Sequence, residues 1–241
     1  MKDLVFIPAR AGSKGIKNKN LAKINNKPLI AHTIDFIKKI PNFIWFISTD
    51  GKKIFNISKK LGFRFNYLRP KKISNSRSKV CDAVFDAHSW LKKNHDLDFK
   101  NIVLLQPTSP IRQKKEFLKA YNLFKRKKLK SLASVTTMRE FPEECVEIKN
   151  NKKWSFLKKK KNKNSFGRQS YSKEYFFIDG SFYIINYEFL KKHKKFVVEN
   201  QTFFFKLNSR WPIDIDEKDD LALCELITKN KKKLKIIQNI K

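Results

Sequence analysis

Short apolar runs alternate with amphipathic stretches over the first two thirds of this 241-residue chain. The apolar runs typical of buried strands are 4–8, 43–48, 63–68, 101–105 and 132–137. Apolar residues at helical spacing predict helices over 28–40, from the caps Thr49 and Asp50 to 61, over 80–91 and over 114–127. Alternation of this kind predicts an α/β fold with a mostly parallel sheet and helices on both faces.

The alternation breaks between residues 139 and 175. Within this stretch, Asn150-Asn151 is typical of a turn, and the segments 144–149 and 153–157 on either side of it predict a hairpin. The earlier rhythm then returns, with candidate strands at 176–185 and 203–207 and a helix near 221–227. We therefore expect one domain over 1–241, with 139–175 as an extension suited to packing against another subunit in a homodimer.

The charge of the chain is strongly one-sided, with 55 Lys and Arg against 22 Asp and Glu and a net charge of +33. Lysine supplies 46 of the 55 basic residues, and lysines occur along nearly the whole chain. Proteins that read nucleic acids usually use arginine forks and interleaved aromatic rings. We interpret the excess as a solvated lysine surface without specific nucleic-acid binding, and a lysine-rich nucleic-acid-binding protein is the alternative from another class.

Membrane and extracellular classes have little support in the sequence. No apolar stretch approaches the roughly 18 residues needed to cross a bilayer, and the run Leu4–Ile7 is too short for a signal-peptide core. The three cysteines are scattered, so neither a disulfide framework nor a zinc site is expected. We predict a cytoplasmic protein that does not contact a membrane.

The first candidate site directly follows the first predicted strand and reads PARAGSKGIKNKNL over residues 8–21. Two glycines, Gly12 and Gly15, allow close approach of an anion, and exposed amides can form a nest for phosphate oxygens. Arg10, Lys14 and Lys19 place three cations on the same loop, which suits a triphosphate. The spacing matches neither a Walker A loop nor a GxGxxG fingerprint. The competing interpretation is a basic turn without a ligand.

A second candidate loop, QPTSPIR over 106–112, follows the strand at 101–105 and presents an amide and two hydroxyls. It is weak evidence by itself. The third candidate is Asp214-Ile215-Asp216, where an extended chain places both carboxylates on one side. Two carboxylates together with substrate phosphates are a usual setting for Mg²⁺. The competing interpretation is an acidic helix cap, which Asp219 and Asp220 can provide without the other two.

These motifs, together with the segment IDGSFYI at 178–184, resemble the acylneuraminate cytidylyltransferases, the CMP-sialic acid synthetases. The resemblance covers essentially the whole chain in order. The related Kdo cytidylyltransferases have a different first loop. The resemblance implies a Rossmann-like nucleotidyltransferase fold, a homodimer, Mg²⁺ as cofactor, and CTP and an acidic nine-carbon sugar as substrates.

The resemblance also implies roles for individual residues. Those implied to bind the nucleotide are Arg10, Ala11, Gly12, Ser13, Lys14, Lys19, Asn20 and Arg69. Those implied to bind the sugar are Gln106, Thr108, Ser109, Arg168 and Tyr183. Asp214 and Asp216 would hold the metal, and Lys19, Arg10 and Asp216 would be catalytic. For Arg168, which would pair with the sugar carboxylate, an ordinary surface arginine is the alternative.

The implied reaction is attack of the anomeric hydroxyl of the sugar on the α-phosphorus of CTP, with release of pyrophosphate. The sequence leaves open whether Asp216 or the metal activates the hydroxyl. It also leaves open whether the sugar is a sialic, legionaminic, pseudaminic or Kdo-like acid. Three positions depart from the family pattern. Val80 replaces a small hydroxyl residue, Asp179 replaces an asparagine, and the short segment before Asp214 leaves Phe203 and Phe204 as candidates for the acyl pocket.

Overall fold

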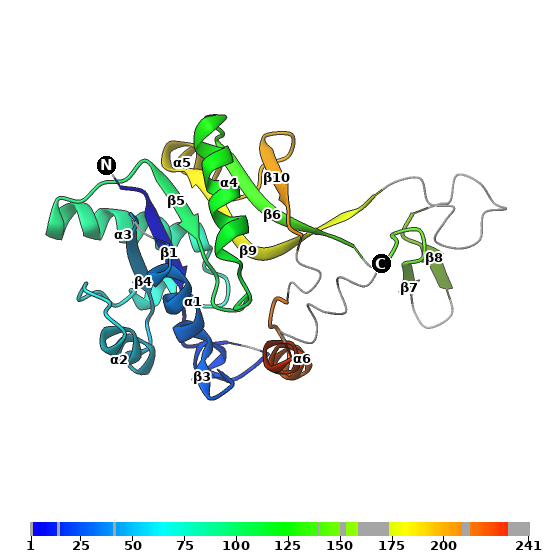
Figure 1. Cartoon of the computed structure of the whole chain (residues 1–241), viewed down its shortest axis with the longest axis horizontal. Helices are drawn as coiled ribbons and strands as arrows, with labels where there is room; N and C mark the ends of the chain where they lie inside the picture. Colours follow the sequence, from blue (N-terminus) through cyan, green and yellow to red (C-terminus); the bar gives the residue numbers. More distant parts are fainter. Residues whose placement is uncertain are drawn as a thin grey trace.

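A six-stranded sheet organises the computed structural model of the protein (Figure 1). The structure describes residues 2–13, 15–40, 42–138, 140–149, 153–158, 174–208 and 213–230. Across the sheet the strands lie in the order β10, β6, β9, β5, β1, β4. Their bounds are β1 Leu4–Pro8, β4 Ile44–Ser48, β5 Asn101–Leu104, β6 Ser131–Thr137, β9 Phe176–Asn186 and β10 Thr202–Lys206.

Most of the neighbouring strands are parallel, but β9 runs against both of its neighbours. β1 is parallel to β4 and β5, and β6 is parallel to β10. β9 is antiparallel to β5 and to β6. The mostly parallel sheet is therefore confirmed. The reversal of β9 was not predicted, because the apolar pattern of a strand records burial and not direction.

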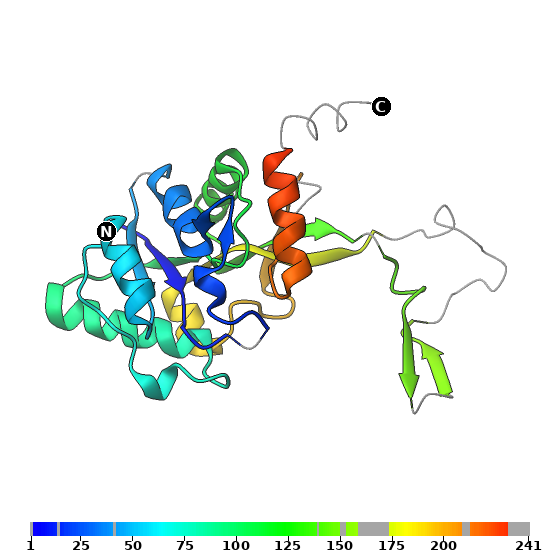
Figure 2. The ribbon, with the colours of Figure 1, turned by 90° about the horizontal axis from the view of Figure 1, so that it is seen from below.

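Helices cover both faces of the sheet, as predicted. Figure 2 shows α1 and α4 on one side and α3 and α5 on the other. The helices are α1 Leu29–Lys38, α2 Lys52–Lys60, α3 Val80–His95, α4 Lys114–Arg126, α5 Tyr187–His193 and α6 Lys218–Lys229. Shorter elements are the 3₁₀ turns Lys19–Leu21 and Lys71–Ile73 and the paired strands β2 Lys23–Ile24 and β3 Lys27–Pro28. In the ranges that the structure describes, no helix combines the length and the apolar character needed to cross a bilayer.

The predicted cap of α2 is wrong. The helix begins at Lys52 with Gly51 in the capping position and no side-chain cap. The Thr49 hydroxyl accepts a hydrogen bond from the Gly51 amide, and Asp50 accepts one from Ala11, 39 residues earlier in the chain. Both residue types are good caps in general, but here a tertiary contact uses the Asp50 carboxylate.

The predicted strand at 63–68 is also wrong. This described segment has no regular secondary structure and takes part in no strand pairing. Its alternating aromatic residues Phe63, Phe65 and Tyr67 pack against the ring of Phe46 in β4. The alternation of apolar and polar residues therefore indicated correctly which side chains are buried. The packing of the rings buries them without backbone pairing to a neighbouring strand. The other predicted elements are confirmed to within four residues at their ends.

Two apolar clusters form the interior of the part of the chain that the structure describes. The larger fills the space between the sheet and the helices that cover it. The smaller lies beside α6 and consists of Ile16, Ile24, Leu29, Ile213, Ile215, Cys224 and Ile227. Because Ile16 belongs to the first candidate loop and Ile215 to the acidic segment, the smaller cluster holds these two distant parts of the chain together.

The extension predicted at 139–175 contains a separate hairpin. β7 Val146–Lys149 and β8 Lys153–Phe156 pair antiparallel and lie away from the main sheet (Figures 1 and 2). The turn predicted at Asn150-Asn151 lies outside the described residues. The hairpin is exposed along its length and carries large apolar side chains, among them Ile148, Trp154 and Phe156.

A buried carboxylate ties the start of β1 to two neighbouring elements. Asp3 is 4% exposed and accepts hydrogen bonds from Asn101 Nδ2 to each oxygen at 3.1 Å and from the Tyr121 hydroxyl at 2.7 Å. Lys125 lies 3.3 Å from the same carboxylate. Burial, together with the hydrogen bond to Asp3, raises the pKa of Tyr121, so the phenol remains a donor at neutral pH.

Replacing this carboxylate should lower stability strongly. Asp3→Leu leaves the Asn101 amide and the Tyr121 hydroxyl without their acceptor, and we expect unfolding to become easier by about 2–4 kcal/mol. Urea denaturation measures the change. Asp3→Asn keeps one acceptor oxygen and should lose clearly less. Equal stability of Asp3→Leu and the unchanged protein would show that the network contributes nothing.

Candidate active site

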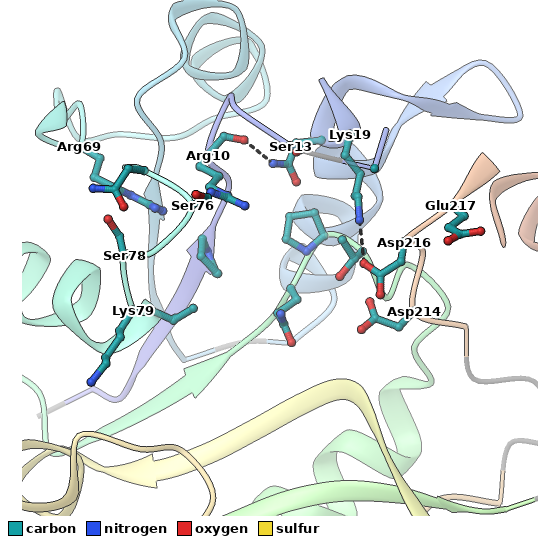
Figure 3. A pocket seen from close by; sticks show the side chains of 18 residues that line it. Arg10, Ser13, Lys19, Arg69, Ser76, Ser78, Lys79, Asp214, Asp216 and Glu217 are labelled. Carbon is teal, nitrogen blue, oxygen red and sulfur yellow. Dashed lines mark hydrogen bonds and ion pairs between the residues drawn. The ribbon is translucent and has the colours of Figure 1, made fainter. Parts of the chain in front are cut away.

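A cleft of about 520 Å³ lies beyond the carboxyl ends of β1 and β5 (Figure 3). The predicted residues that line it are Arg10, Ser13, Lys19, Asn20, Arg69, Gln106, Thr108, Asp214 and Asp216. Four chain segments far apart in sequence thus converge where open α/β sheets usually bind ligands. Of the other predicted residues, Ala11, Gly12, Ser109 and Tyr183 are not among those lining this cleft. Lys14 and Arg168 lie outside the described residues.

Pro8, Gly15 and Pro107 of the two candidate loops also line the cleft. Further lining residues were given no role from the sequence, namely Asn75, Ser76, Ser78, Lys79 and Glu217, and Val80 lines the cleft beside them. The segment 75–79 joins the 3₁₀ turn at 71–73 to the start of α3. The signal that could have identified this segment is its run of polar residues directly before a helix, since such loops often present hydrogen-bond donors to a ligand.

Backbone hydrogen bonds fix the loop after β1. The Ala9 amide donates to Ser48 O at 2.9 Å, and the Ser13 amide donates to Ala11 O at 3.2 Å. The Ala11 amide donates to Asp50 Oδ1 at 2.8 Å. The predicted nest of free amides is therefore wrong for these three residues. The side chains of Arg10 and Lys19 from this loop point into the cleft (Figure 3).

Asn20 and Arg69 have clear structural contacts. Asn20 is 6% exposed and donates from Nδ2 to Arg10 O at 2.8 Å, which supports the backbone of that arginine. Arg69 donates from Nε to Ser48 Oγ at 2.8 Å and from a terminal nitrogen to Ser48 O. Burial lowers the pKa of Arg69, and the nearby Arg10 also acts to lower it. Both residues line the cleft and also shape its wall.

The acidic segment has the geometry that its sequence predicts. Ile213 and Ile215 are buried while Asp214 and Asp216 are exposed toward the cleft, so both carboxylates lie on one side. The Ile215 amide donates to Thr108 O at 2.8 Å, which fixes the segment against the second candidate loop. The cap of α6 is provided by Asp220, which accepts from the amides of Asp216 and Glu217. Helix capping therefore does not explain Asp214 and Asp216.

The first loop and the acidic segment are in direct contact. Lys19 Nζ lies 2.8 Å from Asp216 Oδ1, and the two side chains are 12% and 75% exposed (Figure 3). Gly15 packs so closely that a Cβ on it would lie 2.5 Å from the backbone oxygen of Asp216. A cation and two carboxylates thus face one cleft.

The two carboxylates interact unfavourably. Burial raises the pKa of Asp214, and the charge of Asp216 raises it further, whereas Thr108, Lys19 and Arg112 act to lower it. Although part of Asp214 faces the cleft, the surrounding protein removes enough water to make its negative charge costly. A cation between the carboxylates would relieve this cost.

The donor set fits Mg²⁺ together with a substrate. In the described residues, no group of three or more His, Cys, Asp and Glu side chains is placed to hold a metal by itself. Two carboxylates on one side of an extended segment leave further positions to phosphate oxygens, which is a common arrangement for Mg²⁺. Asp214 and Asp216 are therefore suited to this ion.

Arg112 joins the second candidate loop to β9 and α1. It donates from Nε to Ser181 O at 2.6 Å, from Nη1 to Thr33 Oγ1 at 3.2 Å and from Nη2 to Gln106 O. Burial lowers its pKa to about 9, and Asp214 and Asp179 oppose the decrease. The guanidinium is charged at neutral pH and places Gln106 relative to β9.

Tyr183 and Ser109, two predicted sugar contacts, are not among the residues that line the cleft. Burial, with smaller contributions from Asp214 and Asp179, raises the pKa of Tyr183 to about 12. Ser109 is 2% exposed, and its hydroxyl has no hydrogen-bond partner in the described part of the chain. Asp179, which departs from the family pattern, accepts from Ser134 Oγ and from the Ser181 amide and so has a structural contact.

Sequence comparisons give consistent matches. The family model described as cytidylyltransferase matches residues 4–236. The chain is 28% identical to the N-acylneuraminate cytidylyltransferase of Escherichia coli O18:K1:H7, over 99% of this chain and 55% of that protein. It is 31% identical to the CMP-N,N'-diacetyllegionaminic acid synthase of Legionella pneumophila, over 93% of this chain and 95% of that protein. The chain therefore spans about half of the first relative and nearly all of the second.

A comparison with solved structures supports the same fold. A CMP:2-keto-3-deoxy-manno-octonic acid synthetase complexed with CTP superposes with a TM-score of 0.68 at 14% identity. The superposition covers 96% of this chain and 100% of that one. At this identity the likeness concerns the fold alone.

The contact of Gly15 with Asp216 should tolerate no side chain. In Gly15→Ala the new methyl group meets a backbone oxygen that cannot rotate away, so one of the two segments has to shift. We expect a loss of about 1–3 kcal/mol in the free energy of unfolding, measured by chemical denaturation. Gly12→Ala is the matched control in the same loop, because a Cβ there meets nothing within 4 Å. Similar losses in the two variants would contradict the proposed close contact.

Proposed function

The chain belongs to the cytidylyltransferase family, and on this premise we propose that it transfers CMP from CTP to an acidic nonulosonic sugar and releases pyrophosphate. The observation that carries the proposal is the meeting of Arg10 and Lys19 with the Asp214–Asp216 pair in one cleft. Such a cleft matches a metal-bound triphosphate, since cations and a metal share its negative charge. A polyanion-binding surface has no need of two carboxylates in its groove, which argues against the nucleic-acid alternative.

The proposed reaction is a displacement at phosphorus. The anomeric hydroxyl oxygen forms a bond to the α-phosphorus, the bond from that phosphorus to the oxygen bridging it to the β-phosphorus breaks, and pyrophosphate leaves with the electron pair. Arg10 and Lys19 would offset the charge that develops on the phosphoryl oxygens. The exposed Asp216 carboxylate is our candidate for accepting the hydroxyl proton, through the oxygen that does not hold the metal.

The proposed cofactor is Mg²⁺, held by Asp214 and Asp216. When bound, it would add positive charge at the phosphates and orient them. Lys19 forms an ion pair with Asp216 across the cleft. We propose that its positive charge partly neutralises the two carboxylates until the substrate complex forms. We place the reaction in the cytoplasm because CTP is supplied there.

For the sugar we propose an N-acylneuraminate, with Gln106, Thr108 and Tyr183 as contacts. Gln106 and Thr108 line the cleft beside the acidic segment, and Tyr183 lies close enough to Asp214 for its charge to affect the phenol. Arg168 remains our candidate partner of the sugar carboxylate, from the sequence alone. A panel of sialic, legionaminic, pseudaminic and Kdo acids assayed for pyrophosphate release would identify the preferred substrate.

Pyrophosphate release should depend on CTP, an acidic sugar and Mg²⁺, and on both acidic residues of the pair. We expect Asp214→Ala and Asp216→Ala to lower kcat by about 10²-fold or more, because each removes a ligand of the metal. A coupled pyrophosphate assay measures the rates. Asp219→Ala, an exposed acidic residue in the first turn of α6, is the matched control and should stay near the unchanged rate. Normal turnover in both pair variants would rule out the metal assignment.

We also propose a homodimer in which the β7–β8 hairpin packs against a second copy. The support is the row of exposed apolar side chains, with Trp154 at 60% and Phe156 at 46% exposure. Their rings lie 5.2 Å apart in an edge-to-face pair. At a net charge of +33 two copies repel each other, so apolar contact has to provide the attraction.

Trp154→Glu should convert the dimer into a monomer. Because the substitution lowers the net positive charge, dissociation cannot come from added repulsion and would reflect the lost apolar contact. Light scattering at micromolar concentration and moderate salt measures the mass. Leu226→Glu, at a position on α6 that is 59% exposed, is the control and should leave the dimer intact. A monomer before any substitution would disprove the proposal.

A further inference from the structure

The last residue of β4 and the three residues that follow it, Ser48 to Gly51, contact two separate parts of the cleft wall. On one side, Ser48 O accepts from the Ala9 amide and Asp50 Oδ1 accepts from the Ala11 amide. On the other side, Thr49 O accepts from the Arg69 amide at 2.7 Å, and Ser48 accepts from the Arg69 guanidinium. This short segment therefore sets the distance between the first loop and Arg69.

The hydrogen bonds of this region surround one residue, Arg10. The amide before it, on Ala9, donates to Ser48 O at the end of β4, and the amide after it, on Ala11, donates to Asp50 Oδ1. Its own carbonyl accepts from Asn20 Nδ2 at 2.8 Å. The backbone of Arg10 is thus fixed at three points, while its side chain extends into the cleft (Figure 3).

We propose that Asp50 is a positioning residue that directs Arg10 toward the triphosphate, an inference that rests on the proposed function. Asp50 is not among the residues lining the cleft, so it acts through the Ala11 amide. A backbone held on both sides of an arginine limits the directions that its side chain can take. The guanidinium is then presented to the phosphates with less loss of conformational freedom on binding.

Gly51 supports the same contact from the adjacent position. A Cβ on Gly51 would lie 3.0 Å from the Ala11 Cβ and 3.4 Å from Ile54. Its backbone, at φ −95° and ψ 114°, is open to any residue. Gly51→Ala would therefore press on Ala11 without straining its own backbone, and it perturbs the loop while leaving the Asp50 carboxylate in place.

Two properties of Asp50 need to be separated. Besides its hydrogen bond, its negative charge acts on the nearby Arg69. Asp50→Asn keeps an oxygen acceptor for the Ala11 amide and removes the charge, whereas Asp50→Ala removes both. If the hydrogen bond is what matters, the asparagine variant should behave like the unchanged protein.

The first measurement is the KM for CTP and for the acidic sugar in each variant. We expect Asp50→Ala to raise the KM for CTP by up to about 10-fold, the usual effect of having to order one long side chain on binding. The KM for the sugar should stay within about 2-fold, and Asp50→Asn should stay within about 3-fold for both substrates. Gly51→Ala should shift the KM for CTP in the same direction as Asp50→Ala.

The second measurement needs no substrate. Hydrogen exchange of the Ala11 amide in the free, full-length protein should be slow in the unchanged protein and in Asp50→Asn, and at least 10-fold faster in Asp50→Ala. Fast exchange in the unchanged protein would overturn the inference. An unaltered KM for CTP in Asp50→Ala would also overturn it. The same holds if Asp50→Ala and Asp50→Asn raise the KM for CTP equally, or if Asp50→Ala raises the KM for CTP and the KM for the sugar by the same factor. Protection of Ala11 without any CTP-dependent reaction would instead disprove the proposed function and leave the hydrogen bond established.

Discussion

The site depends on a close contact between two segments that lie about 200 residues apart in the chain. Residues 15–19 of the first loop meet residues 213–216 through the Lys19–Asp216 ion pair and through the approach of Gly15 to the Asp216 carbonyl. Beneath them, Ile16 and Ile215 share one apolar cluster. Apolar burial fixes the distance, and the ion pair fixes which polar groups face each other. Without this contact the cationic loop and the carboxylate pair would belong to different surfaces.

The reversed strand β9 packs against both the second candidate loop and the acidic segment. It lies between β5 and β6, and near Gly180, at φ +70°, its register with β6 shifts. A Cβ at this glycine would lie 3.0 Å from Ser109 Oγ and 3.3 Å from Asp214 Oδ2. The second loop and the acidic segment can approach β9 only because that position carries no side chain. Arg112 then bonds the second loop to the strand.

Electrostatics explains how a chain of charge +33 can hold a specific acidic site. In the described ranges most lysines are exposed to solvent, where their effect on a distant group is screened. Asp216 instead pairs with Lys19 at 2.8 Å, and the charges of Lys19 and Arg112 act on the partly dehydrated Asp214. The local arrangement of the charges around the cleft, and not the net charge, decides what this cleft can bind.

The sequence by itself determined most of the elements, the fold class and the polar groups that the two candidate loops and the acidic segment bring to the cleft. Apolar periodicity depends on burial, and the spacing of Asp214 and Asp216 on an extended chain determined that they share one side. Only the tertiary structure decided how the elements pair. The segment 63–68 has the burial pattern of a strand, yet its rings pack without a ladder, and β9 runs against its neighbours. It likewise decided that Asp50 binds Ala11 instead of capping α2. A carboxylate accepts a hydrogen bond from an amide that the fold brings within reach. Which amide that is depends on contacts between residues far apart in the sequence.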